Sequence, residues 1–337
     1  MGLGGLAYGG SITPERLTAS MTAYQPKIAN QIKTRRPMNE FMMRNKKLYS
    51  GGTEVGIRIR YRRSGKIADS GGVGVWSYYD ELSTTPTDTV KAIGERFSNL
   101  NAPIVISMEE EWENDGEKMF DRLKEQTTFA EDDLGEDVND VAWGISGGDG
   151  NKLPTPVTDI VSGTDSLTLY GIAKSSTSNT HMNSQEVNSV GDLETELLDA
   201  MREGELLVID NSPNMNDKID GWMTHRDVYL GLEKILPQYV QVSSTKDADL
   251  GFDQIIFNKV PIRWDSDCPL DSDQKYQMFG FVLKYWETAI RRQNNFKVTP
   301  FVSMLPKQYA NAAQLGVSLA FVCNNPRTNV RIKGIEL

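Results

Sequence analysis

The longest patterned stretch of the chain, residues 108–143, reads MEEEWENDGEKMFDRLKEQTTFAEDDLGEDVNDVAW. One set of its residues recurs at spacings of three, four or eight, which is typical of a helix with one buried face. The opposite face is mostly acidic. At 1.5 Å per residue this helix would be on the order of 50 Å long, which is unusual in a globular protein. The buried set consists of Trp112, Phe120, Leu123, Thr127, Ala130, Leu134, Val138 and Ala142.

The start and the interior of this helix carry separate signals. Ser107 precedes the run of glutamates and Glu110 stands three residues later, a pairing that predicts a capping box. The acids of the first turn also suit the positive end of the helix dipole. Gly116 and Gly135 are expected to bend or interrupt the helix, because each costs roughly 1 kcal/mol relative to Ala.

The stretch that follows the helix, residues 145–154, reads ISGGDGNKLP. Glycines after an amphipathic run predict the end of a helix and a turn, and Pro154 would prevent the helix from continuing. Asp149 is then expected to be a turn residue and not a ligand. The glycines expected to release the chain are Gly147, Gly148 and Gly150.

Residues 54–63, EVGIRIRYRR, alternate with a period of two, which predicts a strand. A second strand is expected at 88–98, and the long connection between the two predicts a hairpin that projects from the body. One face of the first strand would carry Val55, Ile57, Ile59 and Tyr61, and the other Gly56, Arg58, Arg60 and Arg62. The connection contains an aromatic cluster of Trp76, Tyr78 and Tyr79.

The remaining segments predict a mixture of helices and strands without an internal repeat, which is an α+β class. Residues 1–50 are interpreted as an arm with limited burial, containing a short helix within 37–48. Further predictions are a helix at 192–203, a buried strand at 206–210, a helix at 226–236, a hairpin turn at 257–260, a strand at 275–286 and two closing strands around the Asn-Asn-Pro of 324–326.

Charge is separated along the chain, whose net charge is −10. Residues 27–66 contain 12 basic side chains and two acids, whereas residues 109–140 contain 14 acids and three basic side chains. Such separation suggests complementary surfaces. The negative total disfavours tight wrapping of duplex DNA, which needs many cationic contacts to phosphate.

The sequence offers few candidates for catalytic or metal-binding residues. Cys268, Cys323, His181 and His225 are isolated from one another, so we expect free thiols in a reducing compartment and no catalytic or metal role. No apolar run approaches the length that crosses a membrane. An acidic cluster could line a calcium site, but an acidic turn between strands is the favoured interpretation. Its members are Asp265, Asp267, Asp271 and Asp273. No cofactor is expected.

Four stretches together resemble the major capsid proteins of tailed bacteriophages, with the capsid-shell fold that these phages share with herpesviruses. The order of the elements carries the resemblance more than any one motif. The stretches are WSYYDELSTTPTD at 76–88 followed by NLNAPIVIS at 99–107, the long helix ending in GGDGN, KVPIRWDSDCP at 259–269 followed by YQMFGFVLKYW, and FVCNNPRTNVRIKGI at 321–335.

This resemblance implies an arm at 1–50, an extended β-hairpin loop at 51–98, a peripheral domain at 99–205 with its spine helix at 108–143, and a mainly axial domain at 206–337 that includes the closing strands. A later segment near 290–306 would complete the peripheral domain. The implied function is that of a structural subunit, not an enzyme, which is made in the host bacterial cytoplasm. It would form hexamers and pentamers of an icosahedral head, or virion capsid, around double-stranded DNA.

The implied partners are other copies of the chain, a portal, a separate scaffolding protein and a decoration protein, with only weak non-specific contacts to packaged DNA and none to a membrane. Two alternatives stay open. A tail or baseplate protein would form rings or tubes, and a carboxylate-dependent enzyme would use the 265–273 cluster or the 145–154 loop.

We expect the basic hairpin to lie across the acidic helix of an adjacent subunit, with aromatic anchors at the tip of the loop. The expected basic contacts are Arg58, Arg60, Arg62, Arg63 and Lys66. The expected anchors are Trp76, Tyr78 and Tyr79. The expected acidic contacts are Glu109, Glu110, Glu111, Glu113 and Asp115.

Overall fold

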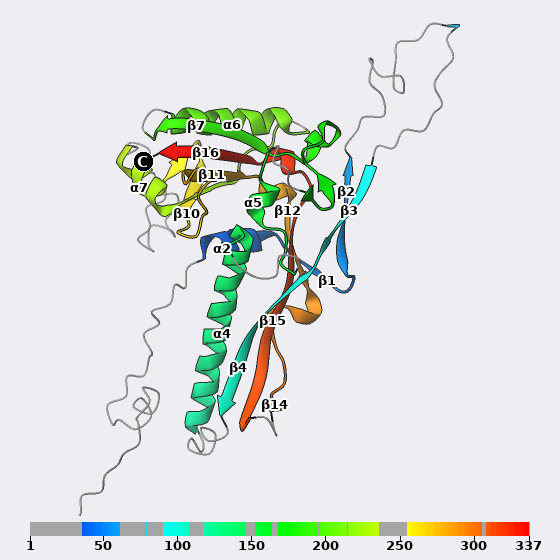
Figure 1. Cartoon of the computed structure of the whole chain (residues 1–337), viewed down its shortest axis with the longest axis vertical. Helices are drawn as coiled ribbons and strands as arrows, with labels where there is room; N and C mark the ends of the chain where they lie inside the picture. The colour runs from blue at the N-terminus through cyan, green and yellow to red at the C-terminus, as the bar shows by residue number, and fades with distance from the viewer. Residues whose placement is uncertain are drawn as a thin grey trace, which may run out of the picture. The chain divides into compact units, whose positions relative to one another are not determined.

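Two six-stranded sheets form the framework of the part of the chain that the structure, a computed structural model, describes (Figure 1). The described residues are 36–60, 78–79, 90–107, 117–145, 152–163, 168–193, 196–213, 215–235, 255–304 and 308–336.

The first sheet is built around one long strand, β15 (Ala310–Cys323), which pairs antiparallel with four others. Its longest partner, β4 (Ser98–Ser107), pairs with it over all ten residues. The other members are β1 (Lys46–Tyr49), β12 (Trp286–Arg291), β13 (Lys297–Val298) and β14 (Val302–Ser303). The mainly apolar sequence of β15 explains its position, since nine consecutive residues from Leu315 to Cys323 are buried.

The second sheet has the order β7-β16-β11-β8-β10-β9, and its central strands β11 and β8 are buried on both faces. Met278 of β11 belongs to a core that contains side chains of α6 and α7, whereas Phe279 and Phe281 belong to the core of the first sheet. The strands are β7 (Gln185–Asp192), β8 (Gly221–Thr224), β9 (Ile256–Phe257), β10 (Val260–Trp264), β11 (Tyr276–Phe281) and β16 (Val330–Glu336). The helices are α6 (Leu197–Asn211) and α7 (Arg226–Ile235).

The long helix is α4 (Glu117–Trp143), which packs against β4 and β15 (Figure 1). Ala130, Leu134, Val138 and Ala142 of the predicted stripe are buried, as the periodicity requires. Residues 108–116 lie outside the described residues, so the capping box at Ser107 and Glu110 stays a prediction. Ser107 itself is the last residue of β4.

The helix ends at Trp143, as predicted, but the glycine that ends it is not one of the three that were expected. Gly144 has a φ of 77°, its N–H donates to the carbonyl of Val141 at 3.2 Å, and the N–H of Ile145 donates to the carbonyl of Asp140 at 3.0 Å. This pair of bonds is a Schellman motif, which needs a left-handed residue and favours glycine there. The exit residue is therefore Gly144. Gly147, Gly148, Asp149 and Gly150 lie outside the described residues.

Gly135 does not interrupt α4, which was one of the two effects expected of it, and it provides room for a neighbour. A Cβ atom at this position would lie 2.8 Å from Nη1 of Arg36. The Arg36 guanidinium donates to the carbonyl of Asp132, and Nδ2 of Asn39 donates to the carbonyl of Gly135 at 3.3 Å. The absence of a side chain thus lets the N-terminal segment approach the helix backbone.

The prediction of limited burial is wrong for residues 37–42, whereas β1 at Lys46–Tyr49 is largely exposed. The short helix α2 (Pro37–Met42) confirms the local pattern, but Met38, Phe41 and Met42 are buried in the main core. A 3-10 turn (Met43–Asn45) then leads into β1, which pairs parallel with β12. The sequence did not indicate this burial, because a helix of six residues is too short for its periodicity to show which face packs against the rest of the protein. Residues 1–35 lie outside the described residues.

A predicted strand at 206–210 is also wrong, because these residues continue α6. The buried positions Leu197, Met201, Gly204 and Val208 keep the helical spacing through the point where the prediction ended the helix. Leu206 then points outward and is 68% exposed. In contrast, α7 confirms the helix predicted at 226–236, and the positive φ values of Asn258 and Lys259 confirm the turn between β9 and β10.

The predicted strand at 275–286 is divided between the two sheets. β11 belongs to the second sheet, a 3-10 turn (Leu283–Tyr285) follows, and β12 belongs to the first. The chain thus crosses from the second sheet to the first. It crosses back at the closing strands, because β15 lies in the first sheet and β16 in the second, and a 3-10 turn (Pro326–Thr328) joins them. The two crossings meet where the N–H of Asn324 donates to the carbonyl of Tyr285 at 2.9 Å.

One buried side chain, Asn329, ties both crossings together. Its Oδ1 accepts a hydrogen bond from the N–H of Val282 at 3.2 Å and from Nε1 of Trp286 at 2.8 Å. Its Nδ2 donates to the carbonyl of Pro326 at 3.2 Å. Asp217 also holds the 3-10 turn Leu283–Tyr285 in place. Its carboxylate accepts hydrogen bonds from Lys284 and from the hydroxyl of Tyr285. Although burial raises the pKa of Asp217, these bonds outweigh it and lower the pKa to about 2.

The other described elements are short. Apart from the hairpin strands β2 (Glu54–Arg60) and β3 (Val90–Arg96), they are α5 (Val157–Ile160), two 3-10 segments (Thr177–Met182 and Arg292–Asn294) and the two-stranded pair β5 (Thr168–Leu169) and β6 (Ile172–Ala173). None of the helices in the described ranges is both long and apolar enough to cross a membrane.

The bonds of Asn329 predict a large effect of its removal. Asn329→Ala leaves two buried donors without an acceptor, and each such group costs about 1–3 kcal/mol. We expect the free energy of unfolding of the unassembled subunit to fall by about 2–5 kcal/mol in urea titrations. Asn324→Ala, at an exposed position of the same turn, is the matched control and should change it by less than about 0.5 kcal/mol. Equal losses of unfolding free energy in the two variants would contradict the stabilising role given to the hydrogen bonds of Asn329.

Candidate assembly interface

The predicted hairpin is present, as β2 (Glu54–Arg60) and β3 (Val90–Arg96) paired antiparallel. Val55, Ile57 and Ile59 are buried, together with Ile93 of the opposite strand. They belong to the main core, so the root of the hairpin is held by its own subunit. The alternate face of β2 carries Arg58 and Arg60, which are exposed, as the period of two predicted.

Few of the predicted contact residues can be placed. Tyr78 and Tyr79 form a turn and are 94% and 99% exposed. Together with Arg58 and Arg60 they are available to a neighbouring molecule. The other predicted contacts lie outside the described residues, so the structure does not test whether the two sets meet. These are Arg62, Arg63, Lys66, Trp76, Glu109, Glu110, Glu111, Glu113 and Asp115.

Within one subunit the basic N-terminal segment already touches the acidic helix. Nη1 of Arg36 lies 3.9 Å from Oδ1 of Asp132. Burial raises the pKa of Asp137, and the nearby Asp133 carboxylate raises it further, whereas Arg36 lowers it. The carboxylates of Asp133 and Asp137 are exposed, so this part of α4 presents negative charge to solvent.

A polar pocket of about 600 Å³ lies at the root of the hairpin. Its lining includes Glu54, Glu95 and Tyr170. Glu95 accepts hydrogen bonds from the N–H of Thr155 at 3.1 Å and from its Oγ1 at 2.7 Å. Burial nevertheless raises the pKa of Glu95, with a further increase from the charge of Glu54. This carboxylate connects the hairpin to the segment that follows α4.

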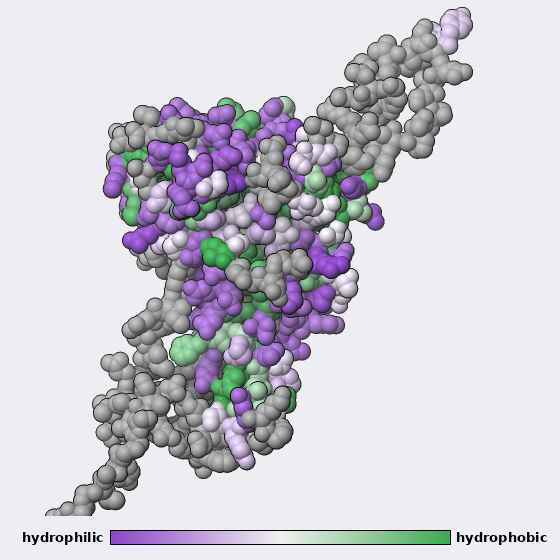
Figure 2. All heavy atoms as spheres, viewed as in Figure 1, coloured by the Kyte–Doolittle hydropathy of each residue, from purple (hydrophilic) through white to green (hydrophobic). Residues whose placement is uncertain are grey.

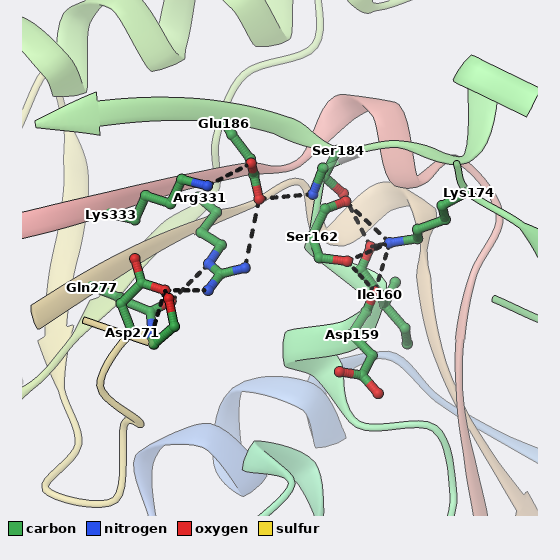
Figure 3. A network of polar contacts seen from close by, with 12 residues as sticks. Asp159, Ile160, Ser162, Lys174, Ser184, Glu186, Asp271, Gln277, Arg331 and Lys333 are labelled. Carbon is green, nitrogen blue, oxygen red and sulfur yellow. Dashed lines mark hydrogen bonds and ion pairs between the residues drawn. The ribbon is translucent and has the colours of Figure 1, made fainter. Parts of the chain in front are cut away.

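A buried lysine organises the segment around α5 (Figure 3). Nζ of Lys174 donates to the carbonyls of Asp159 at 2.6 Å, Ile160 at 3.2 Å and Ser162 at 3.0 Å, and to Oγ of Ser162 at 2.8 Å. Ser184 joins the same group, since its Oγ donates to the carbonyls of Ile160 at 3.1 Å and Pro326 at 2.8 Å. The ammonium group thus satisfies buried backbone carbonyls, which is a structural role.

The second half of this network pairs charges across β7, β16 and β11 (Figure 3). Arg331 lies 3.5 Å from Glu186 and 3.4 Å from Asp271, and its Nε donates to Gln277 at 2.7 Å. Burial raises the pKa of Glu186, but the N–H of Gly163, Lys333 and Arg331 outweigh burial and lower the pKa overall. Glu186 therefore stays ionised at neutral pH and fixes β7 beside β16.

The acidic cluster is not a solvated turn throughout. Asp265 is fully buried, and its carboxylate accepts hydrogen bonds from Asn139 at 3.1 Å and from Nε1 of Trp143 at 3.0 Å. It thereby anchors the last turn of α4 beside the end of β10, while Asp271 pairs with Arg331. Among the described residues, no group of three or more His, Cys, Asp or Glu side chains is arranged to hold a metal ion.

The two cysteine thiols have little reactivity, and the cluster of His225, Asp227 and Tyr276 has a structural role. Burial raises the pKa of Cys323 to about 12 and that of Cys268 well above its usual value, so both thiols are protonated at neutral pH. His225 lies at the start of α7, where its Nδ1 accepts from the N–H of Asp227 at 3.2 Å. The Tyr276 hydroxyl donates to the carboxylate of Asp227 at 3.0 Å, which gives this cluster a capping role.

Sequence reasoning assigned no framework role to the residues that fix the two sheets, namely Asn139, Lys174, Glu186, Asp265, Asn329 and Arg331. Each is polar and adjoins at least one apolar residue, for example Asn139 beside Val138. Polar residues in such positions indicate buried hydrogen bonds, although their partners, more than 40 residues away in most cases, cannot be read from the pattern.

No family model and no curated protein sequence matches the chain. Solved structures do. The capsid asymmetric unit of cyanophage A-1(L) is 14% identical with a TM-score of 0.65, over 96% of this chain and 98% of that one. The capsid of an empty GTA particle is 12% identical with a TM-score of 0.59, over 91% and 99%. The SrpI encapsulin of Synechococcus elongatus PCC 7942 is 10% identical with a TM-score of 0.58, over 95% of each chain.

These similarities extend over nearly the whole length of both chains, so they concern the complete architecture and not a shared motif. At identities of 10–14% they establish the fold. The chain has the α+β capsid-shell fold of phage capsid proteins, as its sequence resemblance implied.

Proposed function

We propose that this chain is the major capsid protein of a tailed bacteriophage, and that its copies assemble into an icosahedral shell around double-stranded DNA. The observation that carries the proposal is the match, end to end, with the cyanophage capsid subunit. The proposal places the protein in the virion capsid after synthesis in the host bacterial cytoplasm. It includes a portal, a scaffolding protein and a decoration protein as partners.

The described hairpin supports a mechanism for assembly. Its apolar face is buried at the root, while Arg58 and Arg60 and the Tyr78–Tyr79 turn are exposed. In the proposed assembly these exposed groups contact the acidic residues 109–115 of an adjacent subunit. Each exposed ion pair contributes only about 0–1 kcal/mol. Repeated in every subunit, such pairs would determine register and partner choice more than affinity.

The two alternatives make different particles. A tail or baseplate protein would form open tubes or rings, and an enzyme would form a discrete small oligomer. Asp265 and Asp271 are engaged in structural bonds, which counts against an enzyme that uses these two carboxylates.

Electron microscopy of the purified full-length chain tests the function. We expect closed shells of uniform diameter, alone or after addition of a scaffolding protein from the same phage, because the proposed function requires each subunit to contact several other copies. Tubes would favour the tail alternative. A small oligomer under all assembly conditions would contradict the proposal.

Charge reversal of the hairpin tests the mechanism. Arg58→Glu, Arg60→Glu and Arg62→Glu combined should block shell formation and leave a folded subunit, because repulsion would replace attraction at every copy of the contact. Circular dichroism and sedimentation velocity separate folding from assembly. Arg202→Glu, at an exposed position of α6, is the matched control and should assemble normally. Normal shells from the triple variant would exclude this contact.

A further inference from the structure

One charged side chain, Glu95, lies on the buried face of the hairpin root. Successive residues of a strand point to opposite faces, so Ile93 and Glu95 share the face of β3 that packs on the body, and Glu95 is only 9% exposed. Figure 2 shows apolar and polar residues next to one another where the described part of the hairpin meets the body. The opposite strand adds only apolar side chains to the buried face, namely Val55, Ile57 and Ile59.

The hydrogen bonds that hold Glu95 come from a neutral residue. Its Oε1 accepts from the N–H of Thr155 at 3.1 Å and from Oγ1 of Thr155 at 2.7 Å. Thr155 lies between α4 and α5, so these two bonds join the hairpin to a distant part of the chain. The polar pocket of about 600 Å³ lies beside them, which gives the carboxylate a solvated place to move into when it leaves Thr155.

Four other titratable side chains line this pocket with Glu95, and they come from each element packed around it among the described residues. They are Glu54 on β2, Arg96 on β3, Lys152 ahead of Thr155, and Tyr170 in the turn between β5 and β6. Nε of Arg96 donates to Oε1 of Glu54 at 3.1 Å, so this guanidinium serves the other carboxylate. The Tyr170 hydroxyl is hydrogen-bonded to the backbone of β15, and Lys152 is exposed.

These surroundings favour the protonated form of Glu95. Burial raises the pKa of Glu95 and the charge of Glu54 raises it further, which outweighs the lowering by the two bonds from Thr155. In an opened root the carboxyl would be solvated, with an ordinary pKa of about 4.3. The closed root therefore holds its proton more tightly than an opened one. Its stability is complete below the ordinary pKa and is lost as the pH rises through the raised pKa.

The backbone at the root has two points about which the hairpin can turn. Before β2, Gly52 has a φ of 100°, a conformation that glycine adopts easily. After β3, the single residue Phe97 leads into β4, and its N–H donates to the carbonyl of Thr53 in a long bond of 3.4 Å. The Arg291 guanidinium donates to the carbonyl of Gly52 at 2.8 Å and so fixes the body side of this hinge. Glu95 lies next to the hinge, on the hairpin side.

We propose that Glu95 and Thr155 form a proton-operated clamp at the root of the hairpin. With Glu95 protonated, the clamp is closed and the root is held against its own subunit. When the proton is lost, the buried charge favours solvation over the bonds from Thr155, and the root opens more often about Gly52 and Phe97. The hairpin carries the exposed arginines of the proposed assembly contact, so the clamp makes their freedom of movement depend on pH.

Hydrogen exchange of the full-length, unassembled chain between pH 5 and pH 8 tests the clamp. Mass spectrometry measures exchange in the peptides that contain β2 and β3, relative to an unstructured peptide at the same pH. We expect this protection to fall at least about threefold from pH 5 to pH 8, since each pKa unit between the closed and opened root corresponds to about a tenfold change in the opening equilibrium.

Glu95→Gln removes the titrating group and keeps an oxygen that accepts from Thr155. This variant should abolish the pH dependence and show at pH 8 the protection that the unaltered chain has at pH 5. Glu54→Gln removes a repelling charge, which lowers the pKa of Glu95, and should reduce the pH dependence. The matched control is Glu205→Gln on α6, where burial also raises the pKa of the carboxyl, and it should leave the hairpin unchanged.

Three outcomes overturn the proposal. They are protection of the hairpin root that stays constant across this pH range, a pH dependence that persists in Glu95→Gln, and an equal loss of the dependence in Glu205→Gln. If Glu95→Gln does not fold by circular dichroism, Glu54→Gln decides in its place, because this carboxylate is exposed and its charge acts on Glu95. A pH dependence as large in Glu54→Gln as in the unaltered chain then excludes the clamp.

The clamp belongs to one subunit, so it is judged separately from the proposed function. The exchange measurement needs neither a shell nor a second copy. A chain that forms shells without a pH-dependent hairpin root retains the function and excludes the clamp. A chain with a pH-dependent root that forms no shells retains the clamp and contradicts the function.

Discussion

The fold depends on one buried side chain, Asn329, at the point where the chain passes twice between its two sheets. One crossing runs from β11 to β12 and the other from β15 to β16. Asn329 belongs to the second crossing and accepts hydrogen bonds from the first. Because buried donors without acceptors are costly, this arrangement permits little independent movement of the two crossings. The relative position of the two sheets follows from it.

Further contacts strengthen the same junction. Phe279 and Phe281 project from the second sheet toward the first, where their rings approach Trp143 at 5.5 Å and Trp286 at 5.7 Å between centroids. Trp143 also donates to Asp265, so the last turn of α4 is bound to the second sheet by both packing and a hydrogen bond. A subunit held in this way can present exposed elements to its neighbours without changing its own framework.

The sequence allowed prediction of elements whose signal is local. The period of two in 54–60 identified β2, and the helical stripe of 130–142 identified the buried face of α4. Predictions failed where the deciding contact is remote. Residues 206–210 look like a strand until Val208 is seen to continue the stripe of α6, and the arm at 37–42 looks exposed until α2 meets α4. Several glycines follow α4, and only the backbone bonds at Gly144 single out the one that ends it.

The candidate interface shows the same division between local and remote signals. Alternation placed Arg58 and Arg60 on the exposed face of the hairpin, yet no local pattern shows which surface of another copy they meet. The proposed function rests on how these exposed charges meet an adjacent copy. A cryo-electron microscopy reconstruction of the assembled particle measures this most directly. The account predicts a closed shell in which Arg58 and Arg60 lie within about 4 Å of the carboxylates of residues 109–115 in an adjacent copy. A particle that is not a closed shell, or a hairpin that contacts only its own subunit, would contradict it.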